Sequence, residues 1–334
     1  MDRNLRSRRA VRCVFSLVLL AGAMSATGIT VPARATAPGE NGRIAFRVYF
    51  NEAHTHGAIF TVRRDGTGLV QVTHRGKTIL DTEPDWSPDG RWIVFMRVAG
   101  IVCSCKPTRL YKVRPNGSHL TRLSHHVCVP GNCVDDVYPA WSPNGKRIAF
   151  TRFDDDAGLV AIYVMRADGT RGRAVPNTAA LGGQYPRYSP DGRDLVFEGG
   201  TSRGAAVFTI RLDGTHLRRV SPWKLHAGGG ADWSPDGRWI LFSSHQDQER
   251  QDNLYLVHPN GSGLHKITAS PAHAHQWGAY SFSPDGTKIT VSHNLGPGTN
   301  PDIVVMNLDG SGLRAVRVTP GVFESSPDWG PVRR

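Results

Sequence analysis

A turn motif with an aromatic residue before it and an apolar segment after it recurs along this 334-residue chain. Its clearest copy, DWSPDGRWIVF at residues 85–95, returns in modified form at residues 141–150, 188–197, 233–242 and 282–291. A second motif, an apolar segment closed by Asp-Gly or Asn-Gly, alternates with the first. It covers residues 59–66, 110–117, 162–169, 207–214, 254–261 and 303–310. The fold must therefore accommodate a unit that repeats many times.

The length and content of the repeat indicate a β-propeller. A period of about 45 to 55 residues that contains only short strands and tight turns is typical of propeller blades and not of helical solenoids. In Ser-Pro-Asp-Gly, the proline presets φ for a turn, the aspartate can bond nearby backbone, and the glycine adopts the left-handed conformation. We therefore expect each repeat to form one four-stranded antiparallel blade, with a short last strand as at residues 69–72 and 264–267.

The two ends of the chain supply complementary halves of one repeat. Residues 41–46 read as a second half without a first half, and residues 328–331 read as a first half without a second. Pairing them would complete a sixth blade and leave no open sheet edge between the first and last blades. The sequence thus predicts an all-β, six-bladed β-propeller whose sixth blade is closed by both termini.

These repeats resemble the WD-like repeats of the TolB-like propeller superfamily, and the resemblance runs from Gly42 to Pro331. It implies the fold far more specifically than the function, because such propellers serve as protein-docking platforms, as gating domains of serine peptidases and in some cases as lyases. TolB itself carries an α/β domain before its propeller. Here Pro38 leads directly into the first strand, so only the propeller portion is expected.

The N-terminus has the features of a secretion signal. Five arginines within the first 12 residues precede an apolar run at residues 14–21, and small residues follow up to residue 37. We expect residues 1–37 to be a cleaved leader and residues 38–334 to be one propeller domain, secreted or periplasmic. Polar residues interrupt the apolar run too early for a stable membrane span.

The net charge favours anionic partners but not nucleic acid. The formal charge of the chain is +12, and residues 1–37 carry six Arg against one Asp, which leaves +7 for the rest. No cluster interleaves Lys or Arg with exposed aromatics, and export separates the chain from nucleic acid. A protein or a cell-envelope glycan is the expected partner class, bound by a monomer.

The strand order predicts where a binding site lies. Both kinds of turn fall on one face of the propeller, and the longer connections emerge on the other, around the mouth of the central channel. Carboxylates near the starts of the first strands should approach this channel and attract basic groups. They are Glu83, Asp85, Asp136, Asp232 and Asp328. The alternative is that they accept hydrogen bonds from neighbouring backbone amides and fix the loops.

Histidines are enriched in the longer connections, but their spacing does not form a zinc motif. We expect neither a metal nor another cofactor. A resemblance to oligogalacturonate lyases, which are propellers with a His-rich metal site, keeps a metal-dependent polysaccharide lyase as the alternative function. His226, His275 with Gln276, and His245 with Gln246 would be its first candidate ligands. We also expect His226 and His275 to line the binding site beside the carboxylates.

Four cysteines remain after the leader: Cys103, Cys105, Cys128 and Cys133. The first pair lies in one long connection and the second in the next, on the same face. In an exported protein this arrangement favours disulfides between the two connections over zinc.

One catalytic pattern occurs by chance. Residues 200–204, GTSRG, match a nucleophile elbow literally, but the strand-turn-helix context of that motif is absent. The sequence therefore predicts an extracytoplasmic binding module rather than an enzyme.

Overall fold

The structure is a computed structural model. It describes residues 38–74, 76, 78–99, 108–126, 133–155, 157–246, 251–269, 277–294, 300–317, 319 and 321–333. Within these ranges the fold is all-β, and the only helices are two single turns of 3-10 helix, η1 (Ala179–Leu181) and η2 (Trp223–Leu225). No helix among them is long and apolar enough to cross a membrane.

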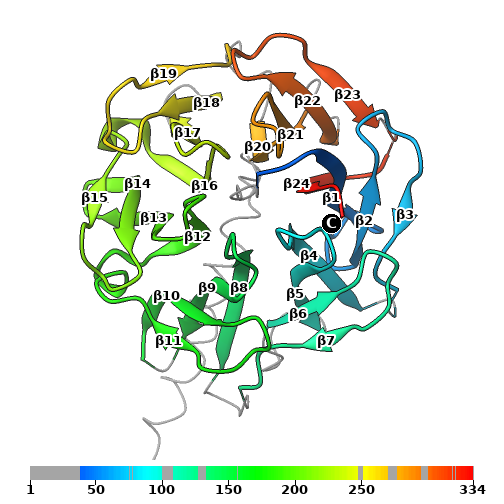
Figure 1. The fold of residues 1–334 in the computed structure, drawn as a ribbon, viewed down its shortest axis with the longest axis horizontal. Helices are drawn as coiled ribbons and strands as arrows, with labels where there is room; N and C mark the ends of the chain where they lie inside the picture. The colour runs from blue at the N-terminus through cyan, green and yellow to red at the C-terminus, as the bar shows by residue number, and fades with distance from the viewer. Residues whose placement is uncertain are drawn as a thin grey trace, which may run out of the picture.

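The strands form six antiparallel blades of four strands each, arranged in a ring (Figure 1), and a single parallel bridge between Gly57 and Leu80 joins the first two blades. Blade 1 contains β24 (Glu324–Pro331), β1 (Asn41–Tyr49), β2 (Gly57–Val62) and β3 (Val70–Gln71), and blade 2 contains β4 (Ile79–Trp86), β5 (Ile93–Ala99), β6 (Arg109–Val113) and β7 (Thr121–Arg122). Blade 3 contains β8 (Val134–Trp141), β9 (Arg147–Asp154), β10 (Leu159–Arg166) and β11 (Arg173–Ala174), and blade 4 contains β12 (Gln184–Tyr188), β13 (Asp194–Thr201), β14 (Gly204–Arg211) and β15 (Arg218–Arg219). Blade 5 contains β16 (Ala227–Trp233), β17 (Ile240–Gln246), β18 (Gln251–Val257) and β19 (His265–Lys266), and blade 6 contains β20 (Trp277–Phe282), β21 (Lys288–His293), β22 (Asp302–Asn307) and β23 (Arg314–Arg317). The six-bladed prediction is confirmed.

Blade 1 is built from both ends of the chain. β24 pairs antiparallel with β1, with Ile44 opposite Trp329 and Ala45 opposite Asp328. Beyond β24 the amide of Val332 donates to the carbonyl of Glu40 at 2.9 Å. The C-terminal segment therefore supplies the innermost strand of the blade that the N-terminal segment begins.

The repeated turn has the geometry that its sequence predicts. In its first copy the Ser87 hydroxyl donates to Asp89 at 2.6 Å, and the amides of Arg91 and Trp92 donate to the Asp89 and Ser87 side chains at 3.0 and 2.9 Å. Gly90 closes the turn at φ 65°. Serine and aspartate thus satisfy the turn's own amides, which fixes the register of the two strands that it joins.

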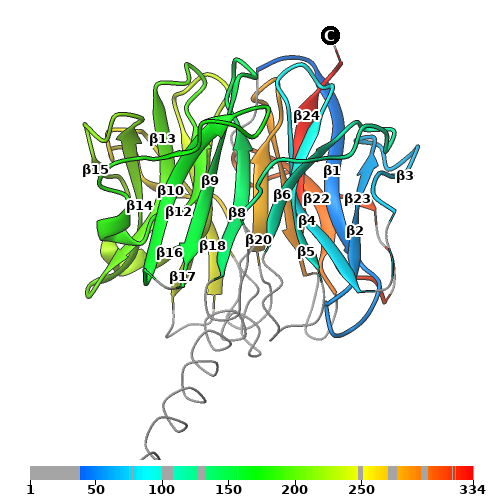
Figure 2. The same cartoon turned by 90° about the horizontal axis from the view of Figure 1, so that it is seen from below.

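The hydrophobic core lies between neighbouring blades. One cluster joins Ile59 and Val72 of blade 1 to Trp86, Phe95 and Val113 of blade 2, all buried. Similar clusters fill the other spaces, so each blade buries its apolar faces against two neighbours. The strands run along the axis of the ring, as Figure 2 shows from the side. The turns between first and second strands therefore lie at one end of the axis, called here the turn face, and the hairpin between β13 and β14 lies at the other, the loop face.

Candidate functional site

Every innermost strand contains a β-bulge at the same level of the axis. The pairing register shifts in β4, β8, β12, β16, β20 and β24, each time a few residues before the end of the strand. The residue at this bulge has a positive φ in Glu83, Tyr138, Tyr185, Gly230 and Ser326. Such bulges redirect a side chain, here toward the axis on which the six blades converge.

Three of the predicted carboxylates join neighbouring blades below this level. The Oδ2 atoms of Asp328, Asp85 and Asp232 accept the backbone N–H of Trp86, Trp141 and Phe282, each in the next blade, at 2.7, 2.7 and 2.9 Å. All three are at most 3% exposed. They lie at the ends of their strands, close to the turn face, and not at the starts as expected, because the motif places each one beside the aromatic residue that precedes the turn.

A buried arginine occupies the same position in blade 4. Arg187 is 0% exposed, and its Nη1 donates to the carbonyl of Pro186 at 2.7 Å. Burial raises the pKa of Asp232 well above its ordinary value, and the carboxylates of Asp328 and Asp85 raise it further while Arg187 lowers it. The buried side chains of four blades therefore converge on the axis close to the turn face.

Glu83, the fourth predicted carboxylate, lies in the bulge layer and is neutralised within the protein. Its Oε1 accepts hydrogen bonds from the hydroxyls of Ser326 and Thr82 at 2.8 and 3.1 Å and lies 3.6 Å from Nη1 of Arg47. Glu83 and Arg47 are 2% and 5% exposed. Glu83 therefore links blades 1 and 2.

Beside Glu83, the bulge layer contains a partly exposed group that the sequence reasoning missed. The rings of Tyr138 and Tyr185 have centroids 3.9 Å apart at an angle of 45°. Oε2 of Glu198, in β13, accepts the amides of Gly229 and Gly230 at 2.8 and 3.3 Å. Tyr138, Tyr185 and Glu198 are each partly exposed, in contrast to the buried layer below.

The ionisation of this group reflects its surroundings. Burial raises the pKa of Glu198 to about 7, although the two glycine amides oppose the rise. Burial also raises the pKa of Tyr138 to about 12, and the charges of Glu83 and Glu198 add to the effect. The same two carboxylates act on Tyr185. The two carboxylates thus act on both tyrosines, and we call these four side chains the axial Tyr–Glu group: Tyr138, Tyr185, Glu198 and Glu83.

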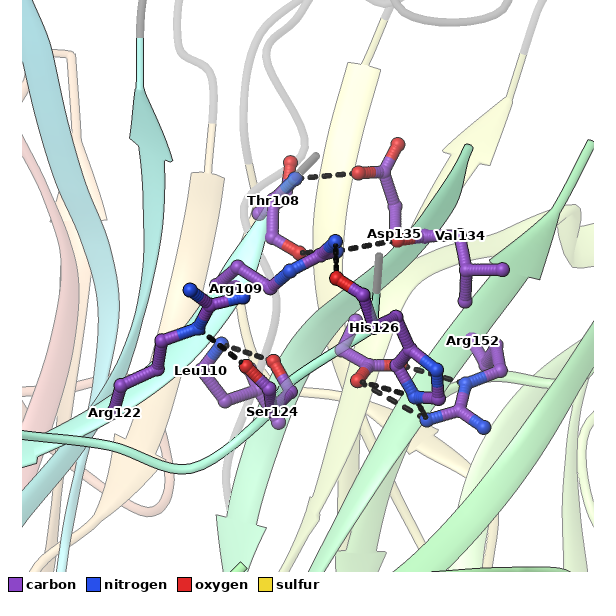
Figure 3. A network of polar contacts seen from close by, with 10 residues as sticks. Thr108, Arg109, Leu110, Arg122, Ser124, His126, Val134, Asp135 and Arg152 are labelled. Atoms are coloured by element: carbon purple, nitrogen blue, oxygen red, sulfur yellow. Dashed lines mark hydrogen bonds and ion pairs between the residues drawn. The ribbon is translucent and has the colours of Figure 1, made fainter. Parts of the chain in front are cut away.

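Asp136, the fifth predicted carboxylate, lies near the start of β8 as expected, but it forms an ion pair with an arginine of the same blade. Nε and Nη2 of Arg152 donate to its two oxygens at 2.7 and 3.1 Å, and Asp136 is 0% exposed. Arg152 also contacts His126 (Figure 3), whose Nε2 must accept because a guanidinium can only donate. Burial, and then Arg152, lower the pKa of His126.

A second arginine, Arg109, bonds residues that flank the two connections containing the cysteines. Nη1 of Arg109 donates to the carbonyl of Val134 at 2.6 Å, and its Nη2 donates to the carbonyl of His126 (Figure 3). Asp135 accepts the amide of Thr108 in the same network. Thr108, which follows the first connection, and His126 and Val134, which flank the second, therefore meet at one guanidinium. Cys103, Cys105 and Cys128 lie outside the described residues, so their pairing with one another and with Cys133 stays a prediction.

The two histidines named as binding residues differ in what can be said of them. His226 ends η2 at φ 42°, and its ring lies against Gly204. His275 lies outside the described residues. Within the described part of the chain, no group of three or more His, Cys, Asp or Glu is placed to hold a metal ion.

The GTSRG segment is a β-hairpin. Thr201 of β13 pairs with Gly204 of β14, and the Thr201 hydroxyl accepts the amide of Arg203 at 3.1 Å. Ser202 therefore lies in an exposed two-residue turn, without the helix that a nucleophile elbow requires.

Comparisons with known proteins identify the family. The family model described as TolB beta propeller domain matches residues 134–334. A TolB homolog from Chlorobium luteolum is 27% identical over 139 residues, which cover 42% of this chain and 28% of that protein. The chain spans less than half the length of the curated relatives that it matches.

Solved structures agree on the fold. TolB from Acinetobacter baumannii superposes with a TM-score of 0.70 at 18% identity, covering 99% of this chain and 74% of that one. An oligogalacturonate lyase from Vibrio parahaemolyticus gives a TM-score of 0.54 at 12% identity, covering 85% of this chain and 78% of that one. At these identities the similarity shows the six-bladed fold alone.

Proposed function

We propose that this chain, which belongs to the TolB β-propeller family, is an extracytoplasmic binding module whose partner docks on the loop face. Propellers of this family are scaffolds that bind proteins. We therefore take a protein as the partner in preference to a cell-envelope glycan. The leader-like residues 1–37 support export of the propeller.

One observation carries the choice of face: the two ends of the axis differ. Toward the turn face, Asp85, Asp232 and Asp328 are buried, and each accepts a hydrogen bond from a backbone amide of the next blade. One layer closer to the loop face, Tyr138, Tyr185 and Glu198 are partly exposed. A rigid ring whose axis is lined by partly exposed polar and aromatic side chains toward the loop face, and by buried ones toward the turn face, favours binding from the loop face.

The test is a pull-down from the native envelope fraction with residues 38–334 as bait and matched charge reversals. Arg203→Glu with Lys224→Glu changes two exposed cations on the loop face, and Arg193→Glu with Arg238→Glu changes two exposed cations on the turn face. The loop-face pair should lose the captured protein, and the turn-face pair should retain it at an unchanged melting temperature. The opposite pattern would move the docking surface to the turns.

The likeness to an oligogalacturonate lyase supports one alternative, a metal-dependent lyase acting on acidic sugar polymers. A lyase would release unsaturated products that absorb in the ultraviolet, and it would need a divalent metal. Incubation of the protein with polygalacturonate and Mn²⁺ separates the two proposals, because a binding module gives no increase in absorbance.

A further inference from the structure

This chain builds the same cation site twice. In blade 2, Nε and Nη2 of Arg97 donate to the two oxygens of Asp81 at 2.5 and 2.7 Å, and its Cζ lies 4.7 Å from the ring centroid of Tyr111. The guanidinium therefore lies between a carboxylate and the face of a tyrosine. This arrangement is favourable because the carboxylate is negatively charged and the ring face has a negative electrostatic potential.

Blade 3 repeats the arrangement one blade further along the chain. Arg152 donates to Asp136 at 2.7 and 3.1 Å, and its Cζ lies 4.3 Å from the ring centroid of Tyr163. Arg97 and Arg152 occupy equivalent positions, two residues after the phenylalanine of the second strand. The same three groups, a guanidinium, a carboxylate and a tyrosine ring, therefore recur at equivalent positions of two blades.

At the axis the same chemical groups occur without the arginine. The rings of Tyr138 and Tyr185 pack on each other, and their side chains share a hydrogen bond, which leaves one outer face of the pair for a ligand. Glu198 provides the carboxylate, held beside them by the amides of Gly229 and Gly230. Among the residues that the structure describes, no Arg, Lys or His side chain lies within ion-pair distance of Glu198, and only backbone amides act on its ionisation besides burial. Arg47, which is close enough to influence Tyr138, is engaged with Glu83 and Thr82.

The fold does not require aromatic residues at these two positions. Tyr138 and Tyr185 have φ values of 54° and 52°, a conformation that bulky residues rarely adopt. Blade 5 has Gly230 at the same bulge, with φ 98°, so a glycine satisfies the backbone there. Two tyrosines held in a strained conformation at one level indicate that their side chains are used.

We propose that Tyr138, Tyr185 and Glu198 bind the guanidinium of an arginine side chain that the docking protein inserts along the axis. The proposal rests on the proposed function, since it specifies the partner chemistry at that face. The arginine would enter from the loop face, because Asp85, Asp232, Asp328 and Arg187 fill the axis on the other side and are buried. Glu83, already paired with Arg47, would not bond the guanidinium directly.

The probe is the capped tripeptide acetyl-Gly-Arg-Gly-amide, whose only charge is the guanidinium, titrated into residues 38–334 by calorimetry. The control peptide carries citrulline, which has the same shape without the charge. We expect a dissociation constant of about 0.1 to 1 mM for the arginine peptide and no measurable binding of the citrulline peptide. Glu198→Gln should weaken binding by about tenfold or more, whereas Glu52→Gln, an exposed carboxylate in the β1–β2 connection on the loop face, should change it by less than about twofold.

A measurement on the unmodified protein keeps the test independent of any folding defect in the variant. The guanidinium binds ionised Glu198, whose pKa is about 7 in the free protein, with Tyr138 and Tyr185 as its titratable neighbours. Binding therefore releases a proton, and the affinity should fall by about tenfold between about pH 8 and about pH 6.

Three outcomes overturn the inference: no binding of the arginine peptide, equal binding of the citrulline peptide, or binding that Glu198→Gln leaves unchanged. Spermidine that binds more tightly than the peptide and displaces it would assign the site to a free polyamine instead. A captured protein that depends on the loop face while the arginine peptide fails to bind would leave the proposed function intact and refute this inference alone.

Discussion

The closure of the ring depends on one tryptophan, so we expect Trp329→Ala to destabilise the whole propeller. Trp329 is 1% exposed in β24. It packs with Ile44 and Phe46 of blade 1 and with Ile303 and Val305 of blade 6. The substitution therefore opens a cavity at the contact between the first and last blades.

The size of the effect follows from what the side chain contributes. The indole N–H of Trp329 has no hydrogen-bond partner among the described residues, so the loss is almost purely apolar packing. Replacing a buried tryptophan by alanine costs about 3–5 kcal/mol, out of about 5–15 kcal/mol for a whole domain. For a chain of this size that corresponds to a melting temperature about 5–8 °C lower. Trp329→Phe should cost much less, because Phe282 occupies the same position in blade 6.

The assay is urea unfolding of residues 38–334 followed by circular dichroism, which does not depend on the tryptophan that is removed. The control is Val332→Ala, just beyond the same strand, whose side chain is 44% exposed. It should change the free energy of unfolding by less than about 0.5 kcal/mol. If Trp329→Ala unfolds like Val332→Ala, the C-terminal strand does not belong to the core and the composite blade is refuted.

Two further predictions concern bonds between elements. Asp85→Ala should lower the free energy of unfolding by about 2–3 kcal/mol, because it leaves the amide of Trp141 buried without its acceptor, and Asp85→Asn should cost less because an oxygen remains. Equal losses in the two variants, measured by the same urea titration, would show that the bond is unimportant. The four cysteines of the mature chain should form two disulfides, so the intact mass should lie four hydrogens below the reduced value. Proteolysis should then link the peptide with Cys103 and Cys105 to the peptide with Cys128 and Cys133, and free thiols would contradict this.

The sequence was sufficient to predict the fold because each blade is specified locally. Serine, aspartate and glycine of the repeated turn satisfy one another within a few residues, as in Ser87, Asp89 and Gly90. The closure was predictable for a different reason. Two unmatched half-repeats at opposite ends of the chain have no other way to cover their edges, and β24 indeed pairs with β1.

The candidate site was only partly predictable, because it depends on contacts between blades. Asp85, Asp232 and Asp328 were expected at the channel mouth, but they lie at the ends of their strands close to the turn face. Their bonds to amides of the next blade and their burial follow from the packing of six strands. Glu198 gave no signal, since its contact with Gly229 and Gly230 joins two different blades.

A signal for the tyrosines was present in the sequence and was not used. The residue that precedes proline in the first strand varies between repeats: Glu83 and Tyr138, then Tyr185 and Ser326. The other positions of the repeat change little. Variation at this one inward-facing position therefore indicates where individual blades have different functions.

This division between constant and variable positions explains how a repetitive ring acquires one specific site. The carboxylates beside the aromatic residues hold neighbouring blades together, so the chain repeats them wherever the contact is needed. The bulge one layer closer to the loop face carries a different residue in most blades. Glu83 and Ser326 form a hydrogen bond there between blades 1 and 2, and the rings of Tyr138 and Tyr185 pack there between blades 3 and 4. Glycine in blade 5 and tyrosine in blades 3 and 4 are tolerated at the same backbone position. We therefore expect substitutions at Tyr138 and Tyr185 to change specificity at a smaller cost in the free energy of unfolding than substitutions of Asp85, Asp232 or Asp328, which accept backbone amides of the next blade.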